Sequence, residues 1–372
     1  MDGNKFARRG IMDMAPYVAG KPVEEVEKEY GIKHAVKLAS NENPLKTSPA
    51  AVAAMQKELQ NVYMYPEGSS PLVRERLARA YGIDAKDIVV GAGGDHVIGL
   101  MCQAFVNEGD EVIVGKPTFK TYELQTIVMG GVLIEVPLKD FTFDLEAIYN
   151  AITEKTKLIF LCNPNNPTST IVKRGEVESF IKKVPDHCIV VFDEAYREYI
   201  SDPDYPNGLE YIKQGRNVMV VRTFSKIYGL AGNRIGYGIA PPHLADVLGR
   251  VLPAFPAGRL AQVAAVAAFD DTAFLAAVKR ENDEGRAYLC AAFDEMCMSY
   301  PPSYGNYIWV DTGMDAGTLN EALLRRGFII RPGTPWGYTT TIRVSIGTMD
   351  ENKGFINALR EMKEKEHAKT TE

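Results

Sequence analysis

The chain has 372 residues, of which 46% are hydrophobic and 24% charged, and its formal net charge is −6. This length and composition are typical of a globular protein with two domains. The acidic balance argues against a nucleic-acid or membrane-surface partner, because both need a basic face, and small molecules are the expected ligands. No apolar stretch reaches the roughly 18 residues that a membrane span requires.

Five cysteines stand in the sequence without any C-x-x-C pair. Most lie in apolar runs, such as Cys162 in "IFLC" and Cys188 in "HCIVVF", which predicts buried free thiols of a reducing compartment. The first residues, "MDGNKFARRG", lead into no apolar segment of the kind that signal peptides carry. We therefore expect a cytoplasmic protein.

The chain divides into three parts by its patterning. Residues 1–45 show little periodicity, and we expect an arm that packs on a smaller domain or on a partner subunit. Residues 46–280 alternate helical periodicity with the β-branched runs "DIVV", "EVIV", "VLIEV", "KLIFL", "CIVVF", "NVMVV" and "RIGYGI". This pattern predicts an α/β fold, a mostly parallel central sheet sandwiched by helices. Residues 281–372, with "NYIWV", "GFII" and "TIRVSI", predict a smaller α+β C-terminal domain.

Polar residues that follow the predicted strands are the candidate site, because such sheets bind ligands at the carboxyl ends of their strands. The segment "DIVVGAGGDHVIGL" enters a helix whose free N–H groups near Gly94 and Asp95 can hold an anion. It lacks the full G-x-G-x-x-G pattern, and a plain tight turn is the alternative. In "KLIFLCNPNNPT", Asn166 can direct its amide at a ligand from an extended loop, although the same residues are usual in turns.

The segment "CIVVFDEAYREY" delivers Asp193 at the end of a strand so apolar that its carboxylate needs a partner. A protonated ring nitrogen of a cofactor would serve, and Tyr196 could reach a neighbouring phenolic oxygen. The alternative is that Asp193 only caps a helix.

The segment "RTFSKIYGLAGNRIGY" follows the next strand and carries Thr223, Ser225 and Lys226, with Arg234 eight residues beyond the lysine. A lysine among apolar neighbours favours its neutral, nucleophilic amine, which suits Schiff-base formation. Hydroxyls and a guanidinium suit a phosphate. An aldehyde for the lysine, a phosphate for the hydroxyls and arginine, and a ring nitrogen for the aspartate together describe pyridoxal 5'-phosphate.

With these motifs in place, the sequence resembles the fold-type I pyridoxal-phosphate aminotransferases, most closely the histidinol-phosphate aminotransferase family. The likeness spans nearly the whole chain, through "PYVAGKP", "NENP", "YPEGSSPLVRERLA", "KPTFKTY", "NPNNPT", "DEAYREY", "RTFSKIYGLAGNRIGYG" and "RVSIGT". The resemblance implies ping-pong transamination, with glutamate and 2-oxoglutarate as nitrogen carriers and no metal ion.

The resemblance also implies roles for individual residues. Lys226 would form the Schiff base, Asp193 would hold the ring nitrogen, and Asn166 and Tyr196 would bond the ring oxygen. Phe119 would stack on the ring, while the phosphate would be surrounded by Gly94, Asp95, Thr223, Ser225 and Arg234. Tyr65 would reach the phosphate of the other subunit, which implies a homodimer with shared active sites. The implied substrate residues are Tyr17, Asn43 and Arg343.

Arg331 in "GFIIRPG" and Arg343 in "TTIRVSIGT" lie at or in apolar strands, where an unpaired guanidinium is costly, so an anion is expected to meet them. The alternative is that one of them pairs with an acidic side chain. Two cations suit a substrate with a phosphate at its far end as well as the carboxylate of glutamate.

The sequence departs from the usual family pattern at His96, Ser169 and Asn233, and in residues 253–258, "PAFPAG", near the expected substrate site. These departures leave the substrate open. Histidinol phosphate with 2-oxoglutarate, giving imidazole acetol phosphate and glutamate, is the favoured pair. An aromatic or other amino-acid aminotransferase is the alternative, followed by an amino-acid phosphate decarboxylase of the same fold. A regulator that reuses the fold is disfavoured, because the chain keeps the lysine and has no added DNA-binding module.

Overall fold

The computed structural model describes residues 5–14 and 20–370, with side chains described up to residue 364. The chain packs as two compact units, which we call the large and the small unit. The large unit consists of Met1–Pro16, Thr47–Asn166 and Ile171–Thr272. The small unit consists of Tyr17–Lys46, Pro167–Thr170 and Ala273–Glu372.

These units differ from the predicted domain boundaries. The predicted arm, residues 1–45, is divided between the two units after residue 16. The predicted boundary between residues 280 and 281 falls inside helix α11 (Thr272–Glu295), which is continuous there. A continuous helix carries no sequence signal at the point where its packing partners change. That the arm packs on a partner subunit stays a prediction.

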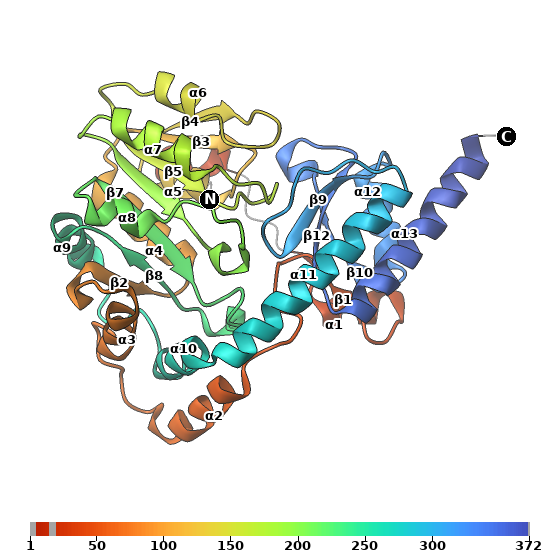
Figure 1. Ribbon diagram of the computed structural model, residues 1–372, viewed down its shortest axis with the longest axis horizontal. Helices are drawn as coiled ribbons and strands as arrows, with labels where there is room; N and C mark the ends of the chain where they lie inside the picture. The colour runs from red at the N-terminus through yellow and green to blue at the C-terminus, as the bar shows by residue number, and fades with distance from the viewer. Residues whose placement is uncertain (1–4, 15–19, 371–372) are drawn as a thin grey trace. The chain divides into compact units, whose positions relative to one another are not determined.

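The large unit is built on a seven-stranded sheet in the order β2-β8-β7-β6-β5-β3-β4 (Figure 1). Its strands are β2 (Ile88–Gly91), β3 (Glu111–Lys116), β4 (Val132–Pro137), β5 (Thr156–Cys162), β6 (Ile189–Asp193), β7 (Val218–Thr223) and β8 (Gly236–Ile239). Neighbours from β4 to β7 are parallel, whereas β8 is antiparallel to both β7 and β2. All seven predicted strands are present, and the mostly parallel α/β fold is confirmed.

Position in the sheet decides how deeply each strand is buried. Strands β6 and β7 are buried along their whole length, as expected for strands covered on both faces. Strand β4 lies at the edge of the sheet, and its Val132 is 46% exposed although the run "VLIEV" is as apolar as the others. Composition alone therefore does not separate an edge strand from a central one.

The helices of the large unit are α2 (Pro49–Glu58), α3 (Pro71–Tyr81), α4 (Gly94–Phe105), α5 (Thr121–Val128), α6 (Leu145–Asn150), α7 (Arg174–Lys183), α8 (Gly208–Lys213), α9 (Pro242–Val251) and α10 (Arg259–Asp270). Most of them flank the sheet, whereas α2 packs on α10 at the lower edge of the view (Figure 1). Three of them have proline in the first turn, where its missing N–H leaves no hydrogen bond unmade. Helix α4 packs against β2, β7 and β8, which fixes the position of its N-terminus relative to the strand ends.

The small unit has the α+β composition predicted for the C-terminal part of the chain. Its helices are α1 (Val23–Tyr30), α11, α12 (Ala316–Leu324) and α13 (Met349–Thr370). Strand β1 (Val36–Lys37) pairs in parallel with β10 (Phe328–Ile329), and an antiparallel sheet has the order β11 (Arg331–Pro332), β12 (Thr341–Ser345), β9 (Tyr307–Asp311). Its core includes the fully buried side chains Phe293, Ile342 and Phe355.

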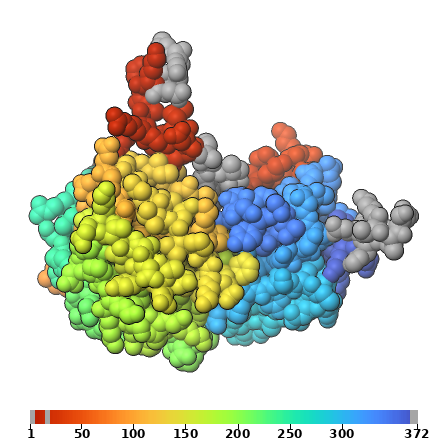
Figure 2. Space-filling model, turned by 90° about the horizontal axis from the view of Figure 1, so that it is seen from above, coloured from red at the N-terminus to blue at the C-terminus, as the bar shows by residue number. Residues whose placement is uncertain are grey.

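Residues 5–14 stand out from the surface of the large unit (Figure 2). Within this segment Arg9 approaches Glu108 at 3.8 Å, but both side chains are more than 80% exposed, so the ion pair holds the segment weakly.

All five cysteines are free, and Cys290 and Cys297 are less buried than the predicted apolar setting suggests. Within the described residues no single helix is long and apolar enough to cross a membrane, and only α10 and α11 taken together as a bent pair meet that length and composition.

Candidate active site

The carboxyl ends of three neighbouring strands bring predicted residues together. Strands β5, β6 and β7 are adjacent and parallel, with Cys162 opposite Asp193 and Asp193 opposite Val221. Asp193 ends β6, Thr223 ends β7, and Asn166 follows the end of β5 by four residues. Because parallel strands end at the same edge of a sheet, these side chains share one edge of the large unit.

Asp193 is a buried carboxylate, only 4% exposed. Its Oδ2 accepts a hydrogen bond from the Tyr122 hydroxyl at 2.7 Å, and its Oδ1 accepts one from the backbone N–H of Ala195 at 3.1 Å. Burial raises the pKa of Asp193 to about 6, and these two hydrogen bonds oppose the rise. The hydrogen bond from Ala195 closes a local turn, and no α-helix begins there. Asp193 is therefore not the cap of an α-helix. A cation bound against Asp193 would stabilise its charge.

Lys226 lies in the connection between β7 and β8, with the buried side chains Phe224 and Ile227 on either side of it in the sequence. Its Nζ lies 5.5 Å from the centroid of the Tyr196 ring, which is itself buried. The structure therefore places the predicted lysine and tyrosine next to each other in the large unit.

The N-terminus of α4 faces a cup that only glycine can form. Gly93 precedes the helix at φ 94°, and no side chain caps the helix. A Cβ at Gly236 would lie 2.7 Å from backbone atoms of Gly93 and Gly94, and one at Gly93 would lie 2.7 Å from Nη2 of Arg234. Arg234 also reaches Ser225 Oγ at 3.5 Å. Helix N–H groups beside a guanidinium and a hydroxyl are the donors that suit an anion such as phosphate.

Two more predicted residues adjoin this cup. Thr223 is 6% exposed, and its Oγ1 accepts from the backbone N–H of Ser225 at 3.0 Å, which shapes the turn after β7. Asp95 lies in the first turn of α4 with its side chain exposed. A carboxylate donates no hydrogen bond, so Asp95 can offer an anion only its backbone N–H.

Phe119 and Asn166 come from two loops that are tied together. Asn165 accepts a hydrogen bond from the Thr118 hydroxyl at 2.8 Å and donates one to the Pro117 carbonyl at 3.0 Å. Asn166 is buried, and Phe119 is half-buried. These bonds hold the aromatic ring and the amide in a fixed relation at the strand ends.

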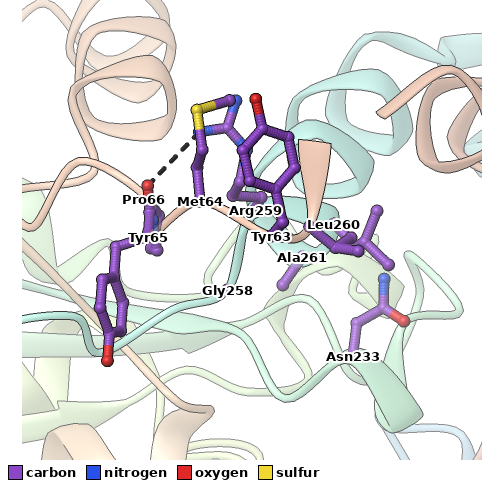
Figure 3. Close-up of a pocket in the computed structure, with 10 residues that line it drawn as sticks. Tyr63, Met64, Tyr65, Pro66, Asn233, Gly258, Arg259, Leu260 and Ala261 are labelled. Atoms are coloured by element: carbon purple, nitrogen blue, oxygen red, sulfur yellow. Dashed lines mark hydrogen bonds between the residues drawn. The ribbon is translucent and has the colours of Figure 1, made fainter. Parts of the chain in front are cut away.

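Tyr65 is not part of this group. Its ring is 78% exposed and stacks on Phe255 with centroids 4.4 Å apart. Its backbone carbonyl accepts a hydrogen bond from Arg259 (Figure 3). Phe255 belongs to residues 253–258, so the segment that departs from the family pattern packs on Tyr65. The surface hollow beside them is lined by Val62, Tyr63, Met64, Tyr65, Pro66, Asn233, Gly258, Arg259, Leu260 and Ala261.

Two of the predicted substrate residues are paired in the small unit. Arg331 on β11 lies directly opposite Arg343 on β12, and Arg343 lies opposite Trp309 on β9. Both guanidinium groups lie over the ring of Trp336, at 5.8 Å from Arg331 and 5.7 Å from Arg343. Arg343 is also 5.5 Å from the ring centroid of Tyr307. The small unit therefore holds two cations within an aromatic frame.

The other two predicted substrate residues are less informative. Asn43 is buried in the small unit, where its Oδ1 accepts from the backbone N–H of Leu45 at 2.9 Å, so this oxygen stabilises its own turn. Tyr17 lies outside the described residues.

The three departures from the family pattern have local structural roles. His96 accepts through Nδ1 from the backbone N–H of Ala92, in the turn before α4. Ser169 has φ 63°, a conformation that favours glycine, and its hydroxyl accepts from the backbone N–H of Gly305 at 2.8 Å within the small unit. Asn233 lines the surface hollow described above.

Three residues that take part in these arrangements were not predicted as site residues from the sequence. Tyr122 stands in the quoted motif "KPTFKTY", but only the strand order shows that it faces the end of β6. Gly236 starts an antiparallel strand, and its need for glycine comes from the close approach of Gly93. Trp336 lies in a short 3-10 turn without periodicity.

Comparison with known proteins agrees with this geometry. Residues 33–359 match the family model described as aminotransferase class I and II. The chain is 46% identical over 356 residues to the histidinol-phosphate aminotransferase of Moorella thermoacetica, covering 95% of this chain and 92% of that one. It is 43% identical to the histidinol-phosphate aminotransferase of Caldicellulosiruptor saccharolyticus, covering 95% and 99%. The structure of histidinol-phosphate aminotransferase from Sinorhizobium meliloti in complex with pyridoxal-5'-phosphate is similar with a TM-score of 0.86 at 27% identity, covering 95% and 98%.

Proposed function

Since this chain belongs to the class I and II aminotransferases, which depend on pyridoxal 5'-phosphate, we propose that it exchanges an amino group between histidinol phosphate and 2-oxoglutarate. Imidazole acetol phosphate and glutamate are then the products. The protein is a transaminase that acts on amino and oxo acids, and the proposal concerns which ones. The observation that carries it is the identity of 46% over 95% of the chain with a histidinol-phosphate aminotransferase.

The large unit fits the cofactor in two independent respects. The glycine-lined cup at α4 brings together helix N–H groups, the guanidinium of Arg234 and the hydroxyl of Ser225, which are the donors that a phosphate needs. The buried carboxylate of Asp193 fits a protonated ring nitrogen. In this assignment the phosphate is held by Gly94, Asp95, Thr223, Ser225 and Arg234, the ring by Phe119, Asp193, Asn166 and Tyr196, and the aldehyde by Lys226.

When bound, the cofactor withdraws electrons from the substrate's α-carbon and so acidifies its hydrogen. Asp193 keeps the proton on the ring nitrogen, because its charge is buried and is best stabilised by a cation. Lys226 would take the proton from the substrate's α-carbon through Nζ and deliver it to the carbon that carries the cofactor's aldehyde, first as a general base and then as a general acid. Tyr196 and Asn166 orient the ring by bonding its oxygen.

The paired arginines of the small unit support a phosphorylated substrate. A phosphate at one end of the substrate and the carboxylate of glutamate in the other half-reaction are both anions that Arg331 and Arg343 can bind. Trp336 limits where the two guanidinium groups can lie, because its ring is near both. The aromatic frame also suits a flat side chain, which keeps an aromatic amino acid as the second candidate substrate.

Replacing Arg343 with alanine is expected to cripple both half-reactions. Arg331→Ala is expected to harm the phosphorylated substrate more than an aromatic amino acid, by about 2–4 kcal/mol in transition-state binding. Single-turnover rates with histidinol phosphate, glutamate and phenylalanine measure both effects. Arg325→Ala, which removes an exposed arginine of the small unit, is the matched control. Equal losses for all three substrates in Arg331→Ala would contradict the assignment of Arg331 to the phosphate.

A substrate panel tests the proposed function directly. Wild-type protein is assayed with 2-oxoglutarate and histidinol phosphate, phenylalanine or tyrosine, and kcat/KM is compared. A preference for phenylalanine or tyrosine would replace the proposal with an aromatic aminotransferase. Product formation without any need for 2-oxoglutarate would instead indicate the decarboxylase.

We also propose that the enzyme is a cytoplasmic homodimer with shared active sites. Support comes from large apolar side chains that cluster in exposed positions on one stretch of the large unit: Val52, Leu59, Val62, Tyr63, Met64, Tyr65, Leu72 and Phe255. Exposed apolar groups of this extent are typical of interaction surfaces, and a two-fold dimer is the commonest assembly. Tyr65 lies within this group, in keeping with a contact to a second subunit.

Mixing inactive Tyr65→Ala and Lys226→Ala proteins is expected to restore activity. Half of the dimers after random exchange are hybrids, and each has one site with both residues intact, so about one quarter of wild-type activity should return. The measurement is activity after subunit exchange, with exchange itself followed by mass spectrometry of tagged subunits. Proven exchange without recovery would mean that Tyr65 serves the site of its own chain.

A further inference from the structure

Tyr122 is held rigidly at the second residue of α5. Its side chain is fully buried, and its ring stacks on Phe160 with centroids 4.5 Å apart and planes at 13°. Phe119 packs edge-on against it at 5.7 Å and 85°. Two aromatic contacts leave the Tyr122 ring one orientation, and in that orientation its hydroxyl donates to Asp193 Oδ2 at 2.7 Å.

The groups around Asp193 show what this hydrogen bond does. Asp95 on α4 and Glu194, which directly follows β6, are acidic and disfavour the charge of Asp193, while the thiol of Cys162 on β5 stays protonated because burial raises its pKa. Glu194 is itself paired with the buried Arg222 at 2.7 Å. The donors that favour ionised Asp193 are the Tyr122 hydroxyl and the backbone N–H of Ala195.

We infer that Tyr122 is a positioning residue that holds Asp193 ionised and turned towards the cofactor ring nitrogen, while its ring supports Phe119 against the cofactor face. The inference rests on the proposed use of Asp193 in transamination. One side chain then sets both the aromatic ring and the carboxylate between which the cofactor ring is expected to lie. Burial raises the pKa of Tyr122 well above its usual value, so its hydroxyl keeps the proton it donates.

Removing the hydroxyl has a consequence that needs no cofactor. The pKa of Asp193 in the folded apoprotein, about 6, lies above its usual value of 3.8. Ionisation therefore costs stability, which falls as pH rises from about 4 to about 6 and then levels off. Without the Tyr122 hydroxyl the ionised form is less favourable still, so the decline should continue to higher pH.

The experiment is urea unfolding of the apoprotein between pH 5 and 9 for wild type and Tyr122→Phe. Tyr211→Phe is the matched control, because Tyr211 is a buried tyrosine that stacks on Phe192 of β6, one residue from Asp193. The decline should extend about one to two pH units further in Tyr122→Phe, since a hydrogen bond to a charged group is lost, and should be parallel to wild type in Tyr211→Phe. In an Asp193→Asn background, Tyr122→Phe should add no pH dependence.

Holoenzyme measurements complete the test. Tyr122→Phe is expected to weaken cofactor binding on the order of tenfold and to shift the pH at which the bound cofactor changes its absorbance. A Tyr122→Phe unfolding profile parallel to wild type would overturn the inference, as would a variant unfolded already at pH 5, which would mark Tyr122 as a packing residue. The unfolding profile uses apoprotein, so its result does not depend on which substrate the enzyme takes. The inference on Tyr122 can therefore be wrong although histidinol-phosphate transamination is found, and it can be right although that activity is absent.

Discussion

Lys226→Ala is expected to lower the transamination rate by at least about 10³- to 10⁴-fold, because in the proposed function Lys226 both holds the cofactor aldehyde and moves the substrate proton. The proposed phosphate site at the N-terminus of α4 is not altered by this change, so the variant should still bind the cofactor, now without a covalent link. Stopped-flow rates measure the loss. Dialysis against cofactor-free buffer measures the loss of covalent attachment.

Reduction of the wild-type holoenzyme with borohydride followed by peptide mass spectrometry identifies the attachment site. The reduced cofactor should be found on Lys226. Lys182→Ala, which removes an exposed lysine on α7, should behave as wild type in all three assays. Finding the label on any other lysine would show that the site was assigned to the wrong residue.

Asp193→Asn is expected to lower the rate of α-proton abstraction by about 10²- to 10³-fold, because the amide does not hold a proton on the cofactor ring nitrogen. Rapid-reaction kinetics of the half-reaction with glutamate measure the effect. Near-normal turnover in this variant would mean that Asp193 serves only to form the turn with the N–H of Ala195.

The same substitution should stabilise the apoprotein. Since the pKa of Asp193 is raised from 3.8 to about 6, the ionised carboxylate destabilises the empty fold above pH 6, and its removal should add about 1–3 kcal/mol at pH 8. Below about pH 4 the carboxyl is protonated in the folded and the unfolded state, so this gain should vanish there. Denaturant unfolding at the two pH values provides the comparison.

Much of the fold was predictable because burial leaves a plain mark on the sequence. Each of the seven strands was predicted from a β-branched run, and Asp193 stood out as a carboxylate at the end of one of them. The antiparallel direction of β8 was not predicted, although the chain between Thr223 and Gly236 contains no α-helix that could carry a crossover. Parallel neighbours need such a crossover, so the connection length held information that the strand pattern did not.

Contacts between segments that are far apart in the chain could not be predicted from the sequence. Tyr122 and Asp193 meet only because α5 follows β3, two strands away from β6 in the sheet order. Likewise Arg331 and Arg343 were both singled out, but their direct pairing comes from the register of β11 with β12. Periodicity reports which face of an element is buried, whereas pairing depends on which element lies next to it.

The ladder that joins β11 and β12 places Arg331 directly opposite Arg343, and both guanidinium groups lie near the ring of Trp336. Like charges opposite each other in a sheet repel, and the Trp336 ring and the Ala39 carbonyl, which accepts a hydrogen bond from Arg343, oppose that repulsion here. In the proposed function a bound anion would lie near both guanidinium groups and lower the repulsion between them. On that proposal, anionic ligands are expected to stabilise this sheet more than neutral ones, so that ligand charge would be reported as a change in stability.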